Sequence, residues 1–226
     1  MKTPIDTARL AEVGQRLADQ VLQVGIDGKG PLKGAEEVAA EHLRSARGDV
    51  EKAITKLIAT HVRLAAVSGA VTGAGGLITL PIAVSASLAG LYIVATRMTA
   101  GIAHLRGYDI HSEEVRSAIL VCLLGSGASS AISKAGVEIG QKSALAALQK
   151  LPGRVLIDIN RRIGYRLVTK AGQKGVINLT KMVPLVGAPI GATVDGVGCK
   201  SISVYALRTF EPLDDTGPTG VGGTVE

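Results

Sequence analysis

Residues Leu64 to Thr96 read LAAVSGAVTGAGGLITLPIAVSASLAGLYIVAT, thirty-three in a row without a charged side chain. Because about 20 apolar residues are enough for one bilayer-spanning helix, this run could form one span or two shorter helices. Gly73, Gly75 and Gly76 lie mid-run, and Pro81 lacks a backbone donor. The run therefore predicts an apolar hairpin: a helix from Val62 to about Gly73, a glycine turn, and a helix from Leu80 to about Leu105.

The composition is typical of a helical protein whose interior is built from small residues. The 226 residues include 29 glycines, four tyrosines, one phenylalanine and no tryptophan, and the mean hydropathy is +0.32. Small residues let helix backbones approach closely, both in membranes and in tightly packed soluble bundles. Almost no segment alternates polar and apolar residues with period two. We therefore expect an all-α fold, a multi-helix bundle around the central glycine-rich apolar hairpin.

We expect a single helical domain over residues 1–210, followed by a disordered acidic tail over residues 211–226. The tail reads EPLDDTGPTGVGGTVE and holds four acids and no base. The N-terminus carries charges throughout and lacks the apolar core of a signal peptide, which predicts a cytoplasmic protein. Cys122 and Cys199 have apolar neighbours and no CxxC spacing, so they are predicted to be buried free thiols.

Positive charge is concentrated in one stretch of the chain. Without the tail the body carries +10 (25 bases minus 15 acids), and Gln141 to Lys181 has nine bases against one acid. Within it, Arg154 to Ala171 predicts an amphipathic helix with a basic stripe. Anionic lipid headgroups need only charge, whereas nucleic acid is not an expected partner because aromatic stacking platforms are scarce. The candidate membrane- or partner-binding residues are Arg154, Arg161, Arg162, Arg166, Lys170 and Lys174.

The chain shows no established pattern of catalytic or cofactor-binding residues. AILVCLLGSGASSAI lacks the third glycine of a dinucleotide-binding turn, no GxxxxGK[ST] motif is present, and the four histidines form no metal-ligand cluster in sequence. We expect neither a cofactor nor a metal. Asp195 is the one candidate for chemistry, because a carboxylate in an apolar segment must be paired if it is buried. A salt bridge to Lys181 and a catalytic role are the two interpretations of Asp195.

Four segments resemble, in order, the EcsC family of bacterial proteins: GPLKGAEEVAAEHL, VTGAGGLITLPIAV, RMTAGIAHLRGYDIHSEEVRSAILVCLLG and KMVPLVGAPIGATVDGVGCKSISVYALRTF. The resemblance covers roughly Gly30 to Phe210. It implies a helical protein on the cytoplasmic side, with a membrane protein such as a transporter as a candidate partner, and it implies no catalytic residues. The candidate structural or ligand-binding residues are Gly73, Gly75, Gly76, Pro81, Lys181, Pro184, Gly187, Gly191 and Asp195.

Three functional hypotheses follow from the sequence. The leading one is a non-enzymatic, membrane-associated or transport-associated protein, peripheral on the inner face of the cell membrane through its basic helix and apolar hairpin. The second is a soluble helical protein that binds a lipid or another hydrophobic ligand in an apolar cavity. The third is an uncharacterised enzyme in which Asp195 acts with a histidine or a lysine.

Overall fold

The computed structural model describes residues 7–74, 80–124, 145, 153, 156–157, 160–161, 163 and 184–213. No strand occurs among these residues, and a single isolated bridge joins Lys29 and Leu32 in the turn after the first helix. The all-α prediction is confirmed over this part of the chain. The bounded helices are α1 (Thr7–Ile26), α2 (Ala35–Ser45), α3 (Val50–Ala74), α4 (Leu80–Leu105), α5 (Glu113–Leu123) and α9 (Pro184–Thr209).

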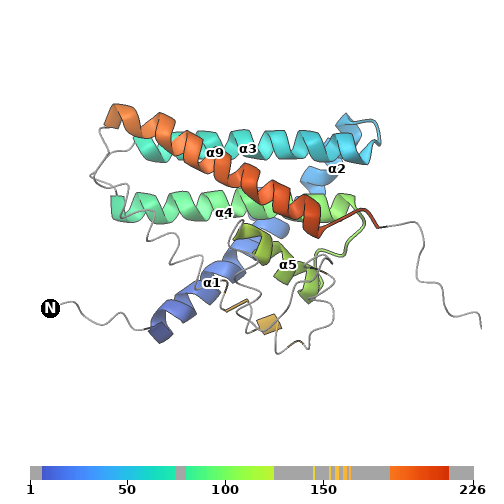
Figure 1. Cartoon of the computed structure of the whole chain (residues 1–226), viewed down its shortest axis with the longest axis horizontal. Coiled ribbons are helices and arrows are strands. Elements are labelled where there is room, and N and C mark those ends of the chain that lie inside the picture. Colours follow the sequence, from blue (N-terminus) through green and yellow to red (C-terminus); the bar gives the residue numbers. More distant parts are fainter. Residues whose placement is uncertain are drawn as a thin grey trace, which may run out of the picture.

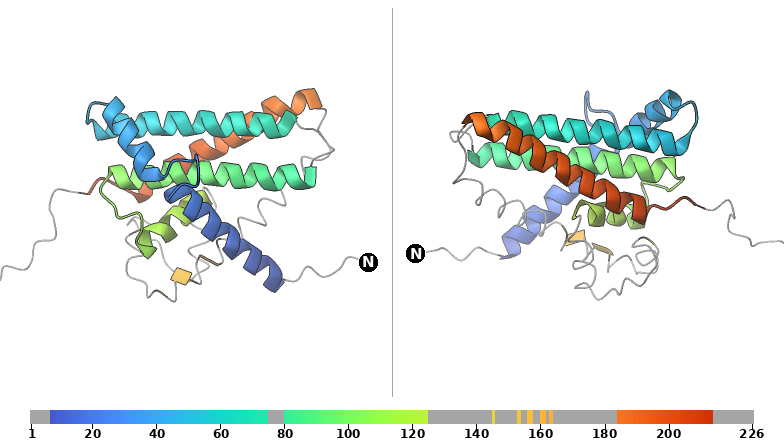
Figure 2. Two further views of the ribbon diagram at one scale, coloured as in Figure 1. Left: turned by 180° about the vertical axis from the view of Figure 1, so that it is seen from behind. Right: turned by 45° about the horizontal axis from the view of Figure 1, so that its top comes forward.

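The long helices α3, α4 and α9 form one side of the molecule (Figure 1). α3 and α4 lie side by side in opposite directions, and α9 crosses over both of them. The views of Figure 2 show α1 and α5 on the other side of α4, with α2 beside the beginning of α3. α4 contacts each of the other helices named above, and Ala95, Met98 and Ile102 on it are fully buried. The core of the described fold is therefore centred on α4.

Two of these helices begin with a side-chain cap. Asp49 precedes α3, and its Oδ1 accepts a hydrogen bond of 2.9 Å from the backbone N–H of Lys52. Ser112 precedes α5, and its hydroxyl accepts from the backbone N–H of Val115 at 3.4 Å. Each cap satisfies one of the backbone donors that a helix leaves free in its first turn. Aspartate and serine are both among the residues preferred at this position.

A glycine ends α4. Gly107 has a φ of 85°, a conformation that residues with a Cβ rarely adopt. Its N–H donates to the carbonyl of His104 at 3.0 Å, and the N–H of Tyr108 donates to the carbonyl of Ala103 at 3.1 Å. This pair of bonds is a Schellman motif, which satisfies the last carbonyls of the helix. The Gly107-Tyr108-Asp109 sequence thus has a structural role in stopping α4 and turning the chain towards α5.

The long helices differ in two ways from the sequence prediction. α4 has the predicted bounds, but α3 begins at Val50, well before the predicted start at Val62, and continues as one helix to Ala74. α9 is one helix from Pro184 to Thr209, although the exposed Pro189 lies inside it. Proline removes one helix hydrogen bond, and contact with α3 stabilises the helix in spite of that loss. The predicted glycine turn at Gly75 and Gly76 lies outside the described residues.

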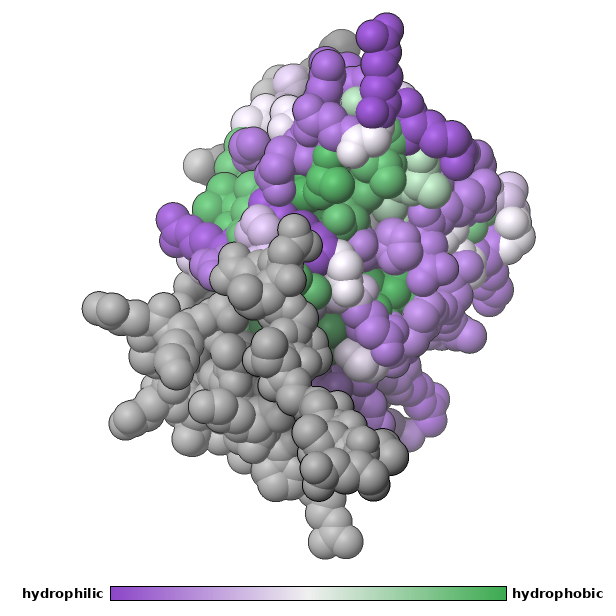
Figure 3. Space-filling view, turned by 90° about the vertical axis from the view of Figure 1, so that its right-hand side faces the viewer, coloured by the Kyte–Doolittle hydropathy of each residue, from purple (hydrophilic) through white to green (hydrophobic). Residues whose placement is uncertain are grey.

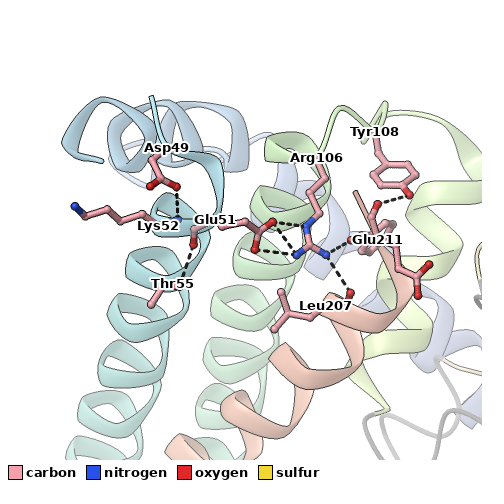
Figure 4. A network of polar contacts seen from close by, with 9 residues as sticks. Asp49, Glu51, Lys52, Thr55, Arg106, Tyr108, Leu207 and Glu211 are labelled. Carbon is pink, nitrogen blue, oxygen red and sulfur yellow. Dashed lines mark hydrogen bonds and ion pairs between the residues drawn. The ribbon is translucent and has the colours of Figure 1, made fainter. Parts of the chain in front are cut away.

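One end of the long helices is held by a polar network (Figure 4). The guanidinium of Arg106, just after α4, makes bonds of 3.0 to 3.2 Å to the carboxylate of Glu51 at the start of α3. It also donates to the carbonyls of Leu207 and Phe210 at the end of α9. Figure 3 views the molecule from this end, where hydrophilic residues cover much of the described surface around smaller hydrophobic areas. We call this the polar end.

Candidate functional site

The opposite end of the long helices is built from three uncharged segments. The end of α3, the beginning of α4 and the beginning of α9 lie together there (Figures 1 and 2). We call residues 64–74, 80–96 and 184–194 the apolar end, and none of them is charged. Two uncharged runs far apart in sequence thus meet in space. Within the part of the chain that the structure describes, no helix is both long and apolar enough to cross a membrane.

Large apolar side chains are exposed on and beside the apolar end. Val67 on α3 is 62% exposed, and Val197, in the turn of α9 that follows the apolar end, is 64% exposed. Leu64 and Val194 are also exposed. The nearest exposed charges on these two helices are basic, Arg63 on α3 and Lys200 on α9. An exposed apolar surface with basic residues at its border is a common feature of interaction sites.

α3 and α9 cross with their backbones in contact. A Cβ atom added to Gly69 would lie 2.3 Å from the carbonyl oxygen of Gly191, and one added to Gly191 would lie 2.2 Å from that of Gly69. Real Cβ atoms essentially never approach other atoms this closely. Only glycine therefore fits at either position, and the pair fixes the separation of the two helices. This gives Gly191, a predicted site residue, a structural role.

Asp195 lies one turn after this crossing and is 8% exposed. Its Oδ2 faces Gly69, because a Cβ on that glycine would lie 2.7 Å from it. Burial, and then the charge of Asp195, raise the pKa of Tyr92 to about 12 and that of Cys199 to about 12. Both groups are neutral at physiological pH, so neither supplies an anionic nucleophile beside Asp195. Asp195 is thus a buried carboxylate close to two neutral groups, Tyr92 and Cys199.

A second buried polar group lies where α2, α3 and α4 meet. Arg97 on α4 is 9% exposed and His61 on α3 is 1% exposed. Burial is the main cause that lowers the pKa of His61 to about 4, and the charges of Arg97 and His42 lower it further. His61 is therefore neutral at pH 7. The His61 Nε2 and the Arg97 Nε are buried without a hydrogen-bond partner.

The structure brings together only part of the predicted site. Gly191 and Asp195 lie at the α3–α9 crossing, while Gly73, Pro81, Pro184 and Gly187 lie in helical turns of the apolar end. Arg161, in the basic segment, is exposed, and Leu156 and Ile163 nearby are buried. The other predicted residues, Gly75, Gly76, Arg154, Arg162, Arg166, Lys170, Lys174 and Lys181, lie outside the described residues.

Sequence reasoning missed Arg97 and His61 as a buried pair. Arg97 looked like the charged boundary of the apolar run, and His61 like an ordinary helix residue. Their separation by 36 positions carries no local signal, and only the packing of α3 on α4 brings them together. Gly69 had a signal in the spacing Gly69/Gly73 and Gly187/Gly191, which is typical of close helix crossings. The partner of each glycine, however, required the structure.

The two cysteines agree with the sequence analysis. Cys122 and Cys199 are buried free thiols, as predicted. No cluster of three or more histidine, cysteine, aspartate or glutamate side chains suited to a metal ion occurs among the described residues. His104 and His111 lie near the carboxylate of Glu36 on the surface. The ligand-cavity and enzyme hypotheses stay predictions.

Comparison with known proteins identifies a family. The model of the EcsC protein family matches residues 31–211 of the chain. The matched region begins before α2 and ends just after α9, so it includes the apolar end, the crossing of α3 with α9, and the polar end. No curated protein and no solved structure matches the chain.

Proposed function

The chain belongs to the EcsC protein family over residues 31–211, and for this member we propose a non-enzymatic role at the cytoplasmic face of the cell membrane. In this proposal the apolar end enters one leaflet, and the basic segment around Arg161 contacts anionic headgroups. The observation that carries the proposal is the meeting of three uncharged helix segments at one end of the molecule.

The depth of the apolar end supports insertion into a single leaflet. From Arg63, the last charge on α3, to the end of that helix at Ala74 is eleven residues, or roughly 17 Å at 1.5 Å per residue. The hydrocarbon core of a bilayer is about 30 Å thick, so one leaflet is about 15 Å deep. Arg63 would then lie at the level of the headgroups, where basic side chains are favoured.

The exposed side chains support the same orientation. Val67 and Val197 are each more than three-fifths exposed to water, and transfer of such side chains into hydrocarbon is favourable. The first exposed charges beyond them, Arg63 and Lys200, are cations, which anionic lipids attract by about 1 kcal/mol each. The polar end, with Glu51 and Arg106, lies at the far end of the same helices and stays in water in this proposal.

Cosedimentation with vesicles tests the proposal. We expect the protein to bind phosphatidylcholine vesicles that contain phosphatidylglycerol, and to bind pure phosphatidylcholine more weakly. The variant Val67→Glu places a carboxylate in the inserted surface, which costs about 2 kcal/mol and weakens binding roughly thirtyfold. Val197→Glu places the same charge just outside the apolar end and should weaken binding less. Ala59→Glu adds the same charge at an exposed position of α3 outside the apolar end and serves as the matched control.

A second set of variants tests the basic segment. Replacement of Arg161, Arg162, Arg166 and Lys170 by Glu is expected to reduce binding to anionic vesicles and to remove its salt dependence. The proposal is wrong if the native protein fails to bind anionic vesicles at low salt. It is also wrong if Val67→Glu and Ala59→Glu bind equally well, because membrane contact would then not involve the apolar end.

A further inference from the structure

Arg97 is a buried cation without a compensating acid in the described part of the chain. Arg97 is the first charged residue after the apolar segment of α4, and its Nε has no hydrogen-bond partner. Burial lowers the pKa of Arg97, and no carboxylate among the described residues offsets that effect. A guanidinium removed from water without a counter-charge is costly, so native structures pair such groups almost without exception.

His61 on α3 carries a second buried atom without a hydrogen-bond partner. Its Nδ1 lies 2.8 Å from the carbonyl oxygen of Leu57, so Nδ1 carries the hydrogen and donates it. Nε2 of the neutral ring is therefore a lone-pair acceptor, and it is buried without a partner. Leu57 on α3 packs against Gly101 on α4, where an added Cβ would lie 2.9 Å from the Leu57 Cδ2, and His61 and Arg97 each lie one helical turn from this contact on antiparallel helices. The buried acceptor of His61 and the buried donor of Arg97 therefore lie at the same level of the α3–α4 pair, and neither is hydrogen-bonded.

His42 on α2 completes the group and connects it to solvent. The rings of His42 and His61 are 6.4 Å apart, and the Nε2 of His42 lies 3.3 Å from the hydroxyl of the exposed Thr60. His42 is itself only partly buried, so it forms the solvent-facing side of this group. Basic side chains from α2, α3 and α4 therefore lie in one region of the fold, and both residues that act electrostatically on His61 are basic.

We propose that this junction of α2, α3 and α4 binds a phosphate group that retains one acidic hydrogen. The guanidinium of Arg97 matches two phosphate oxygens, and His42 supplies a further ring nitrogen at the entrance. The P–OH hydrogen is donated to Nε2 of His61, which has a lone pair to accept it. An ionised carboxylate or a sulfate offers acceptors only, and therefore leaves that lone pair unpartnered.

The chemistry selects phosphate monoesters and inorganic phosphate over phosphodiesters. A monoester has a second ionisation near pH 6 and so retains its P–OH in mildly acidic solution, whereas a diester has no such hydrogen. The phosphate comes either from free solution or from a lipid with a monoester headgroup, such as phosphatidic acid. The inference does not depend on insertion of the apolar end, because the site lies in the core of the described helices.

Calorimetric titration and thermal unfolding of the full chain with inorganic phosphate test the proposal, with chloride at equal ionic strength as reference. We expect phosphate to raise the unfolding temperature of the native protein. Arg97→Met keeps the volume and removes the charge, and it should weaken phosphate binding at least about tenfold. Without phosphate this variant should unfold at or above the native temperature, because a buried unpaired charge is gone. Arg63→Met removes an exposed charge from the neighbouring helix and should bind phosphate as the native protein does.

Vesicles distinguish the two sources of phosphate. Binding to phosphatidic acid vesicles that exceeds binding to phosphatidylglycerol vesicles of equal charge, and that is lost in Arg97→Met and in His42→Gln, assigns the site to a lipid even if free phosphate does not bind. Equal phosphate binding by native protein and Arg97→Met overturns the proposal. So does the absence of both a phosphate effect and a preference for phosphatidic acid. Val67→Glu, which tests insertion, should leave the phosphate response intact.

Discussion

Substitution of Gly191 by alanine tests the backbone contact between α3 and α9. The added Cβ would lie 2.2 Å from the carbonyl oxygen of Gly69 and 2.9 Å from its carbonyl carbon. Both atoms belong to the backbone of α3, so no side chain can rotate away to make room. Because real Cβ contacts below 3.0 Å essentially do not occur, the helices must separate by at least about 0.8 Å, the difference between 3.0 and 2.2 Å.

The expected cost follows from two opposing terms. Overpacking of a rigid contact costs about 1–3 kcal/mol, and the upper part of that range applies because the clash is with the backbone. Replacing a glycine inside a helix by alanine raises the free energy of unfolding by about 1 kcal/mol through helix propensity. We therefore expect Gly191→Ala to lower the free energy of unfolding by about 2 kcal/mol.

Gly198→Ala, two turns further along α9, is the matched control. A Cβ at Gly198 would have its nearest contact at 4.0 Å, with Cδ2 of Leu91, which is ordinary van der Waals distance. This variant keeps the propensity gain without the clash and should be more stable than the native protein by up to about 1 kcal/mol. Urea unfolding followed by circular dichroism measures both values. Equal stability of the two variants would refute the backbone contact.

Three further predictions concern buried groups. The pKa of His61 falls from 6.5 in the unfolded chain to about 4 in the fold, so the unfolded state takes up the proton first. The free energy of unfolding should therefore be highest above pH 6.5 and fall by about 3 kcal/mol towards pH 4. Urea titrations at several pH values measure this dependence, which His61→Gln should flatten. Arg106→Met should cost about 2–3 kcal/mol because it removes the donor to the carbonyls of Leu207, in α9, and Phe210, just after it. Glu51→Gln, at a side chain 63% exposed, should cost less than about 1 kcal/mol in the same assay. Burial raises the pKa of the thiols of Cys122 and Cys199 to about 12, so neither should react with a thiol reagent until the protein is unfolded, and rapid reaction of the native protein would contradict their burial.

Helix ends were readable from the sequence because they depend on neighbouring residues. Asp49 and Ser112 accept hydrogen bonds from backbone donors three residues ahead, and Gly107 adopts a left-handed conformation that stops α4. The continuity of α3 and α9 was not readable, because Val62 was predicted as a helix start and Pro189 removes a helix hydrogen bond, yet packing overrides both signals. Local signals predict where helices are able to begin and end, and tertiary contacts decide how far they extend.

The sequence by itself determined that the protein is helical, that it belongs with the EcsC family, and that long uncharged runs separate its charges. Only the tertiary structure decided that two of these runs meet at one end of the molecule, that Gly69 contacts Gly191, and that Arg97 lies beside His61. The physical reason is that charge and helix propensity are properties of a residue and its neighbours, whereas burial and the pairing of a charge depend on which helices pack together.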